Sequence, residues 1–236
     1  MKKSLDLKYF TIIIKETHLK IGVDRESYSR SLASFCTNSL LSLRSDIEKY
    51  IILHPQFQSS FVPLKILPNA PKIIICMGNA AQTANVGPMA AVAGAIAEGL
   101  GEKISGYCKE IIIENGGDIY IKSGKKRIIA VYASKTRFSY QIGLEIEEND
   151  SPLGICTSSG TIGPSISLGK ADAVVIKANT ASLADAVATA TANIINTPED
   201  LKLAIEYANK IAGVTGVLVI KKNILSAWGN IKLVRI

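Results

Sequence analysis

The sequence of 236 residues is poor in side chains that bind zinc or act as general bases. It contains two histidines, His18 and His54, and four cysteines that lie tens of residues apart without a C-x-x-C pair. A structural zinc site and a Ser–His–Asp hydrolase centre are therefore not expected. For Cys36, Cys76 and Cys108 we expect reduced, mostly buried thiols.

Long hydrophobic runs are also missing. No segment reaches the roughly 18 uncharged apolar residues of a membrane span. Asp6 and Lys8 interrupt the apolar part of the N-terminal segment, and no small-residue cleavage site follows it, so we expect a cytoplasmic protein without membrane contact. The net charge of +7 comes from scattered lysines. This favours a phosphate-bearing ligand, whereas nucleic acid is not expected as a partner.

Standard nucleotide-binding motifs are absent as well. The stretch "GPSISLGKA" resembles a phosphate loop, but five residues separate Gly163 from Gly169 where the motif has four, and Ala171 replaces the magnesium-binding hydroxyl. There is no G-x-G-x-x-G after a strand and no G-x-S-x-G elbow. Nucleotide binding, if present, must use another arrangement.

The first half of the chain shows clear element signals. A β-rich hairpin is predicted over residues 9–24, and apolar spacing predicts helix from Asp24, as N-cap, to about His54. Residues 56–71 contain three prolines and predict an extended connector. Gly87 and Pro88 indicate the start of a small-residue helix that ends at 99–101, and this composition lets partners approach closely.

The second half predicts more strands. Residues 109–134 suggest a three-stranded meander, 173–178 a strand, 182–193 a helix, Thr197 the N-cap of another helix, and 216–236 a final hairpin around Trp228 and Gly229. This order predicts an α+β fold of antiparallel sheets with helices packed on one face. We expect one domain over 1–236, with weak halves at about 1–145 and 146–236.

Two glycine-containing stretches are candidates for ligand contact. In "ENGGDIY", Asn115, Gly116 and Gly117 could expose backbone N–H groups to a ligand, but Asn-Gly is also the strongest signal for a simple hairpin turn. In "CTSSGTIGPS", dense hydroxyls suit phosphate oxygens, although loops are often rich in hydroxyls. The hydroxyl residues of that loop are Thr157, Ser158, Ser159, Thr161 and Ser165.

The alanine-rich helix predicted over 182–193 carries Asp185, Thr189 and Asn193 four residues apart, which places them on one side. A carboxylate and a hydroxyl one turn apart suit a hard cation such as magnesium or calcium. A simpler interpretation is that Ser182 and Asp185 form an S-x-x-D cap and that Thr189 bonds to the carbonyl four residues earlier. Capping does not explain Asn193.

The stretches "ENGGDI", "TSSG" and "ADAVVIKANTASLADAVATA" resemble the ApbE-like superfamily, whose founding members transfer FMN from FAD to a threonine of a target protein. The phrases "VGPMAAVAGAIAE" and "GICTSSGTIGPSISLGKADAV" are similar to its uncharacterised cytoplasmic UPF group. The resemblance implies a T-fold-like α+β fold with an internal pseudo-repeat. It also implies a phosphate-bearing ligand such as FAD or FMN, bound with Mg or Ca.

The resemblance assigns roles to residues already noted. Asp185 and Thr189 match the metal-binding positions, with Asp185 also a catalytic candidate. Gly116 and Gly117, flanked by Asn115 and Asp118, match the flavin-side glycine loop. The T-S-G stretch corresponds to residues 157–160, including Gly160.

The chain departs from the transferases at one point. They carry an H-x-x-D-P segment between the T-S-G stretch and the metal helix, where this chain has "TIGPSISLGKADAV". FMN-transferase activity is therefore in doubt, and whether the chain is an enzyme stays open. One alternative is a sulfur-metabolism enzyme or accessory factor using Cys156, against a buried thiol. Another is a homo-oligomeric scaffold packing through residues 88–100, against core packing.

Overall fold

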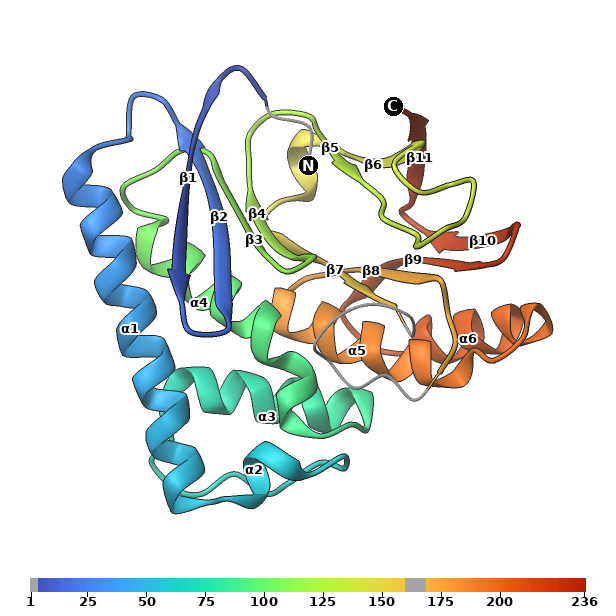
Figure 1. The fold of residues 1–236 in the computed structure, drawn as a ribbon, viewed down its shortest axis with the longest axis horizontal. Coiled ribbons are helices and arrows are strands. Elements are labelled where there is room, and N and C mark those ends of the chain that lie inside the picture. Colours follow the sequence, from blue (N-terminus) through green and yellow to red (C-terminus); the bar gives the residue numbers. More distant parts are fainter. Residues whose placement is uncertain (1–3, 160–168) are drawn as a thin grey trace.

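The computed structural model of the chain describes residues 4–159 and 169–236. Within these residues, eight strands form one antiparallel sheet in the order β1-β2-β3-β4-β7-β8-β9-β10 (Figure 1). Their bounds are β1 Leu7–Ile14, β2 Thr17–Asp24, β3 Ile111–Asn115, β4 Asp118–Lys122, β7 Leu153–Ser158, β8 Ala173–Ala178, β9 Val214–Lys221 and β10 Ile224–Gly229. The order of the strands across this sheet is the same as their order along the sequence, so the topology is simple.

The helices cover one face of this sheet (Figure 1). They are α1 Arg30–Leu53, α2 Gln56–Ser59, α3 Lys72–Ala84, α4 Val92–Ile104, α5 Ala181–Ile194 and α6 Leu201–Ala208, with short 3-10 turns at Pro88–Ala91, Glu148–Asp150 and Pro198–Asp200. The expected α+β class, with antiparallel sheet and helices on one face, is confirmed. No helix in the described part of the chain is long and apolar enough to span a membrane.

A second, small sheet covers the opposite face. It contains β5 Arg127–Ala130, β6 Ile142–Ile146 and β11 Lys232–Arg235 in the order β11-β6-β5. The central strand β8 is consequently buried on both sides. Val174 and Ile176 pack with the helices while Val175 packs with Leu144 under the small sheet, which explains why β8 is continuously apolar instead of alternating.

Two strand predictions are wrong in their pairing. The run around 127–130 is a strand, but it pairs with β6 in the small sheet and does not continue a meander from β4. The C-terminal hairpin is formed by β9 and β10, which Lys222 and Asn223 connect, while β11 leaves to pair with β6. The first hairpin, the strand 173–178 and the Thr197 capping box are confirmed.

Helix boundaries differ from prediction where a tertiary contact replaces a local one. Ser29, not Asp24, caps α1, because the Asp24 carboxylate accepts the N–H groups of Lys109 and Glu110, which directly precede β3. Helix α4 continues past the expected stop at 99–101 to Ile104, whose side chain is buried in the core. The expected connector contains the helix α2. The weak halves at 1–145 and 146–236 stay a prediction.

Candidate functional site

The start of α4 meets the start of α5 at a close backbone contact. The Gly94 N–H donates a 2.9 Å hydrogen bond to Oδ2 of Asp185. A Cβ atom on Gly94 would lie 2.2 Å from the Ala181 carbonyl oxygen. Only glycine permits this approach, so the small residues of this helix serve a contact within the chain.

The first turn of α5 is held by two further contacts. Thr180 is the N-cap, and its side chain accepts a backbone N–H of the first turn at 3.3 Å. Glu98 of α4 accepts hydrogen bonds from the Ser182 N–H at 3.0 Å and from the Ser182 hydroxyl at 2.8 Å. The S-x-x-D interpretation of Ser182 and Asp185 is therefore wrong, because the Asp185 carboxylate is directed to α4.

The glycine turn, residues 115–118, lies next to the start of α4. Asn115 and Asp118 are paired residues of the β3–β4 hairpin, and Gly116 and Gly117 adopt positive φ angles of 68° and 122°. The hairpin interpretation of this stretch is confirmed. In addition, Nδ2 of Asn115 donates a 3.1 Å hydrogen bond to the carbonyl of Ala93, which ties the turn to the first turn of α4.

Asp118 connects the turn to β7. Interactions with the Cys156 thiol and the Thr157 backbone N–H lower the pKa of the Asp118 carboxyl group. Burial outweighs them and raises the pKa of Asp118 to about 7. A carboxyl group with this pKa can exchange its proton near neutral pH, and a cation can replace that proton.

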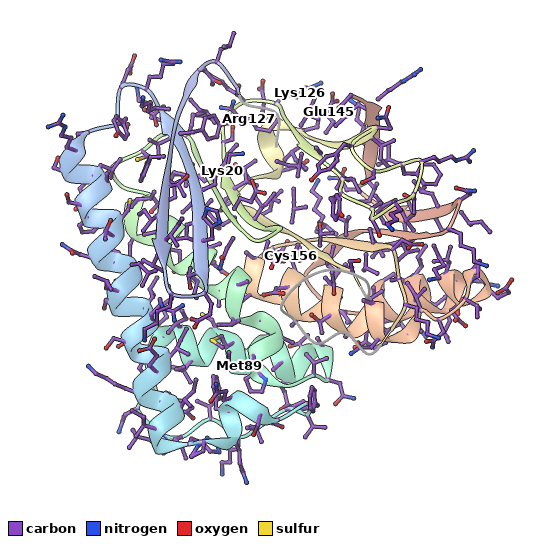
Figure 2. All side chains as sticks on the ribbon, in the orientation of Figure 1. Lys20, Met89, Lys126, Arg127, Glu145 and Cys156 are labelled. Carbon is purple, nitrogen blue, oxygen red and sulfur yellow. The ribbon has the colours of Figure 1, made fainter. Side chains whose placement is uncertain are left out.

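Cys156 lies on β7 between the sheet and α5 (Figure 2). Its side chain is fully buried, and its Sγ also lies within hydrogen-bond distance, 3.3 Å, of the Ala181 carbonyl oxygen. Burial, followed by the nearby charges of Asp118 and Asp185, raises the pKa of the thiol well above its usual range. A thiolate is disfavoured in this position, so the structure supports the buried-thiol interpretation over a reactive nucleophile.

Asp185 is the most enclosed carboxyl group of the cluster, with 9% of the residue exposed. Burial raises its pKa well above the usual range, the charge of Asp118 raises it further, and the N–H groups of Gly94 and Ala93 oppose this effect. Thr189 lies one turn further along α5 and is also buried. Two carboxyl groups and a hydroxyl are hard oxygen donors, the kind that magnesium and calcium prefer.

The protein side chains alone do not complete a metal site. Among the described residues, no group of three or more His, Cys, Asp and Glu side chains is placed to hold an ion. Asp185 and Thr189 therefore fit a cation that obtains its remaining oxygens from water, backbone or a bound ligand. Magnesium bound with nucleotide phosphates has this type of coordination.

The hydroxyl-rich loop is only partly described. Thr157 and Ser158 end strand β7, and the Ser158 hydroxyl is buried without a hydrogen-bond partner among the described residues. A Cβ atom on Gly117 would lie 3.8 Å from the Thr157 carbonyl oxygen, so the end of β7 adjoins the glycine turn. Ser159 follows β7 directly. The other predicted loop residues, Gly160, Thr161 and Ser165, lie outside the described residues.

Sequence reasoning missed the α4 side of the cluster. Gly94 and Glu98 lie more than 80 residues from their partners on α5, and no local pattern pairs them. The available signal was the small-residue composition of α4, which predicted close approach without naming its partner. Asn193 is half-buried at the end of α5.

The antiparallel sheet with helices on one face matches the fold of solved ApbE proteins. The flavinyl transferase ApbE of Pseudomonas stutzeri matches with a TM-score of 0.56 and 13% identity, covering 94% of each chain. The ApbE protein of Thermotoga maritima matches with a TM-score of 0.58 and 11% identity, covering 94% of this chain and 96% of the other. At these identities the likeness shows the fold.

Several proteins are more similar to this chain in sequence than these solved structures are. A UPF0280 protein of Methanococcus aeolicus is 40% identical over 93% of this chain and 89% of its own length. One of Methanocaldococcus jannaschii is 38% identical over 93% and 90%. The profile of the family described as "AbpE bacteria" matches residues 2–217, and the chain belongs to this family. The predicted ApbE-like resemblance and its UPF group are confirmed.

Proposed function

We propose that this protein binds a flavin nucleotide together with a divalent cation at the cluster around the start of α4. The observation that carries the proposal is convergence. The turn at 115–118, the end of β7 and α5 come from separate parts of the sequence. Asn115 of the turn and Asp185 of α5 each bond to the first turn of α4, and the end of β7 lies beside Asp118 of the turn. Such convergence of polar groups is typical of a ligand site.

The chemistry of these groups suits a phosphate-bearing ligand. Amides at Gly116 and Gly117 and hydroxyls at Thr157, Ser158 and Ser159 would donate to phosphate oxygens. Asn115 and Asp118 would fix the turn beside the ligand. The Ser158 hydroxyl, unpartnered among the described residues, supports this arrangement, because a buried polar group without a partner destabilises a protein by about 1–3 kcal/mol.

Asp185 and Thr189 would hold the cation, which when bound neutralises phosphate charge. The raised pKa values of Asp118 and Asp185 support a cation here. A divalent ion offsets the repulsion between two neighbouring carboxylates, and it competes with the protons that otherwise occupy them. Both carboxyl groups can then be ionised at neutral pH.

We do not extend the proposal to FMN transfer or to chemistry at Cys156. The H-x-x-D-P segment of the transferases is absent from the sequence. The Cys156 thiol is buried with a raised pKa, which disfavours the sulfur-chemistry alternative. The scaffold alternative also loses its motivating feature, because α4 packs on α5 and α1 of its own chain.

Titration of FMN and FAD with the purified protein, with and without magnesium, tests the proposal through flavin fluorescence. We expect magnesium-dependent binding, weakened about tenfold or more in Asp185→Asn, a substitution that keeps the side-chain volume. Glu206→Gln is the matched control, since it removes one negative charge from the exposed side of α6. Absence of flavin binding by the folded wild type at millimolar ligand would refute the proposal.

A further inference from the structure

A cavity of about 310 Å³ lies between α1, α3 and α4 and shares Glu98 with the cluster. It is lined by Leu43 and Asp46 of α1, Ile73 and Cys76 of α3, and Glu98 and Gly99 of α4, among others. None of the residues predicted for flavin or metal binding lines it. Its volume is at the small end of ligand pockets, which suits a compact molecule.

Helix α4 presents a regular face to the cavity. Ala95, Glu98, Gly99 and Glu102 recur at three- and four-residue spacing and therefore lie on one side of the helix. A Cβ atom on Gly99 would be 3.2 Å from the Leu43 side chain, so the wall between α4 and α1 is already tight there. The wall is largely apolar, and one partly buried carboxylate, Glu98, projects from it.

The charges of the lining are arranged by depth. Lys72 and Lys103 are exposed at the rim, whereas Asp46 and Glu98 are partly buried. Lys72 is paired with Glu102 at 2.7 Å, and its charge also acts on Glu98. Among the described residues, however, no salt bridge joins Asp46 or Glu98 to a lysine or arginine. Such an interior attracts positive charge and repels anions.

Glu98 is held in place from the other side. Its Oε2 accepts both hydrogen bonds from Ser182 of α5. This contact fixes the side chain, so that Oε1 can receive a donor without new ordering of the chain. Burial raises the pKa of Glu98, while the hydrogen bonds from Ser182 and the charge of Lys72 oppose this effect. A bound cation would therefore stabilise the ionised form of Glu98.

We propose that this cavity binds a small primary amine with an apolar body, its ammonium group hydrogen-bonded to Glu98 and Asp46. The apolar body lies against Leu43, Ile73 and the small residues of α4. An organic cation is favoured over a metal ion, because Leu43, Ile73 and Ala95 offer the apolar contact that a hydrated metal ion does not use. The cavity shares Glu98 with the contact between α4 and α5 but contains none of the residues proposed to bind flavin or a cation, so this proposal does not rest on the proposed function.

The test uses n-butylammonium as probe on the full chain, at constant ionic strength, with butyrate and n-butanol as matched probes. We expect only butylammonium to raise the melting temperature and to slow alkylation of Cys76, which lines the cavity and is partly exposed. Alkylation of Cys76, followed by mass spectrometry, reports occupancy of the cavity directly. Equal effects of butyrate or n-butanol, or no effect of butylammonium, would overturn the proposal.

Two variants localise the binding. Asp46→Asn and Glu98→Gln keep side-chain volume, and each should weaken the butylammonium response about tenfold. The glutamine introduced by Glu98→Gln retains an oxygen acceptor for Ser182, while Asp46 has no part in that contact, so at least one variant keeps the start of α5 intact. Glu206→Gln on α6 is the control and should respond like wild type. An unchanged response in both cavity variants would also overturn the proposal.

Discussion

The contact between α4 and α5 can be tested with a single methyl group. Gly94→Ala places a Cβ atom 2.2 Å from the Ala181 carbonyl oxygen and 2.9 Å from Cβ of Asp185. The two helices must separate by about 1.2 Å before the first distance becomes an ordinary contact of about 3.4 Å. That displacement also lengthens the 2.9 Å hydrogen bond from the residue 94 N–H to Asp185.

The energetic terms can be compared. Overpacking in a close contact costs about 1–3 kcal/mol, and a buried carboxyl group that loses its donor costs about 1–3 kcal/mol. The better helix propensity of alanine returns about 1 kcal/mol. We therefore expect a net loss of about 3 kcal/mol, which lowers the melting temperature of a chain of this size by roughly 6–12 °C.

Gly99→Ala is the matched control on the same helix. Its Cβ would meet only the flexible end of Leu43, at 3.2 Å. The same gain in helix propensity is expected, so the melting temperature should stay within a few degrees of wild type or rise. Thermal unfolding of both variants decides the point. A Gly94→Ala protein as stable as Gly99→Ala would refute the close contact and with it the geometry of the candidate site.

Two other predictions concern groups outside that contact. Arg127→Met should lower the free energy of unfolding by about 3 kcal/mol at pH 7, because it leaves Asp6 and Glu110 without their shared cation. The hydrogen bond from Arg127 lowers the pKa of Asp6, so this stabilisation exists above the ordinary value of 3.8 and is lost as the pH falls below it. Urea unfolding should show the gap to wild type narrowing below about pH 4, and a constant gap would contradict the assignment. In the folded protein iodoacetamide should modify Cys76 first and leave Cys156 unmodified, whereas early modification of Cys156 would show that β7 is open.

Local patterns predicted the type of most elements, but not which sheet each strand joins. Strand β5 alternates buried and partly exposed residues, as any strand with one covered face does, and nothing in its four residues distinguishes β4 from β6 as its partner. Helix α3 was not assigned at all. Its start "KIIIC" is rich in β-branched residues, yet it is helical because Ile73, Ile74 and Met77 reach the core from one face. Tertiary packing overrode propensity there.

For the candidate site, sequence reasoning found the polar groups whose spacing or turn chemistry is unusual. Asp185 is conspicuous in an alanine-rich helix, and Asp118 follows two glycines. Reasoning from sequence could not find Gly94, because its role is to lack a side chain at a contact with a residue 91 positions away. Glu98 was missed for a similar reason. A glutamate on an apparently ordinary helix face becomes informative only when Ser182 is seen beside it.

Two polar residues of α5, Ser182 and Asp185, therefore have structural partners whether or not a ligand binds. Ser182 bonds to Glu98, and Asp185 bonds to the backbone of α4, so both dock one helix on the other. A neutral amide at position 185 would accept the same N–H without the cost of burying charge, since burial raises the pKa of Asp185. Asp185→Asn should consequently fold at least as well as wild type in the absence of cations. If it does, and magnesium stabilises only the wild type, the carboxylate is retained for a cation and not for the fold.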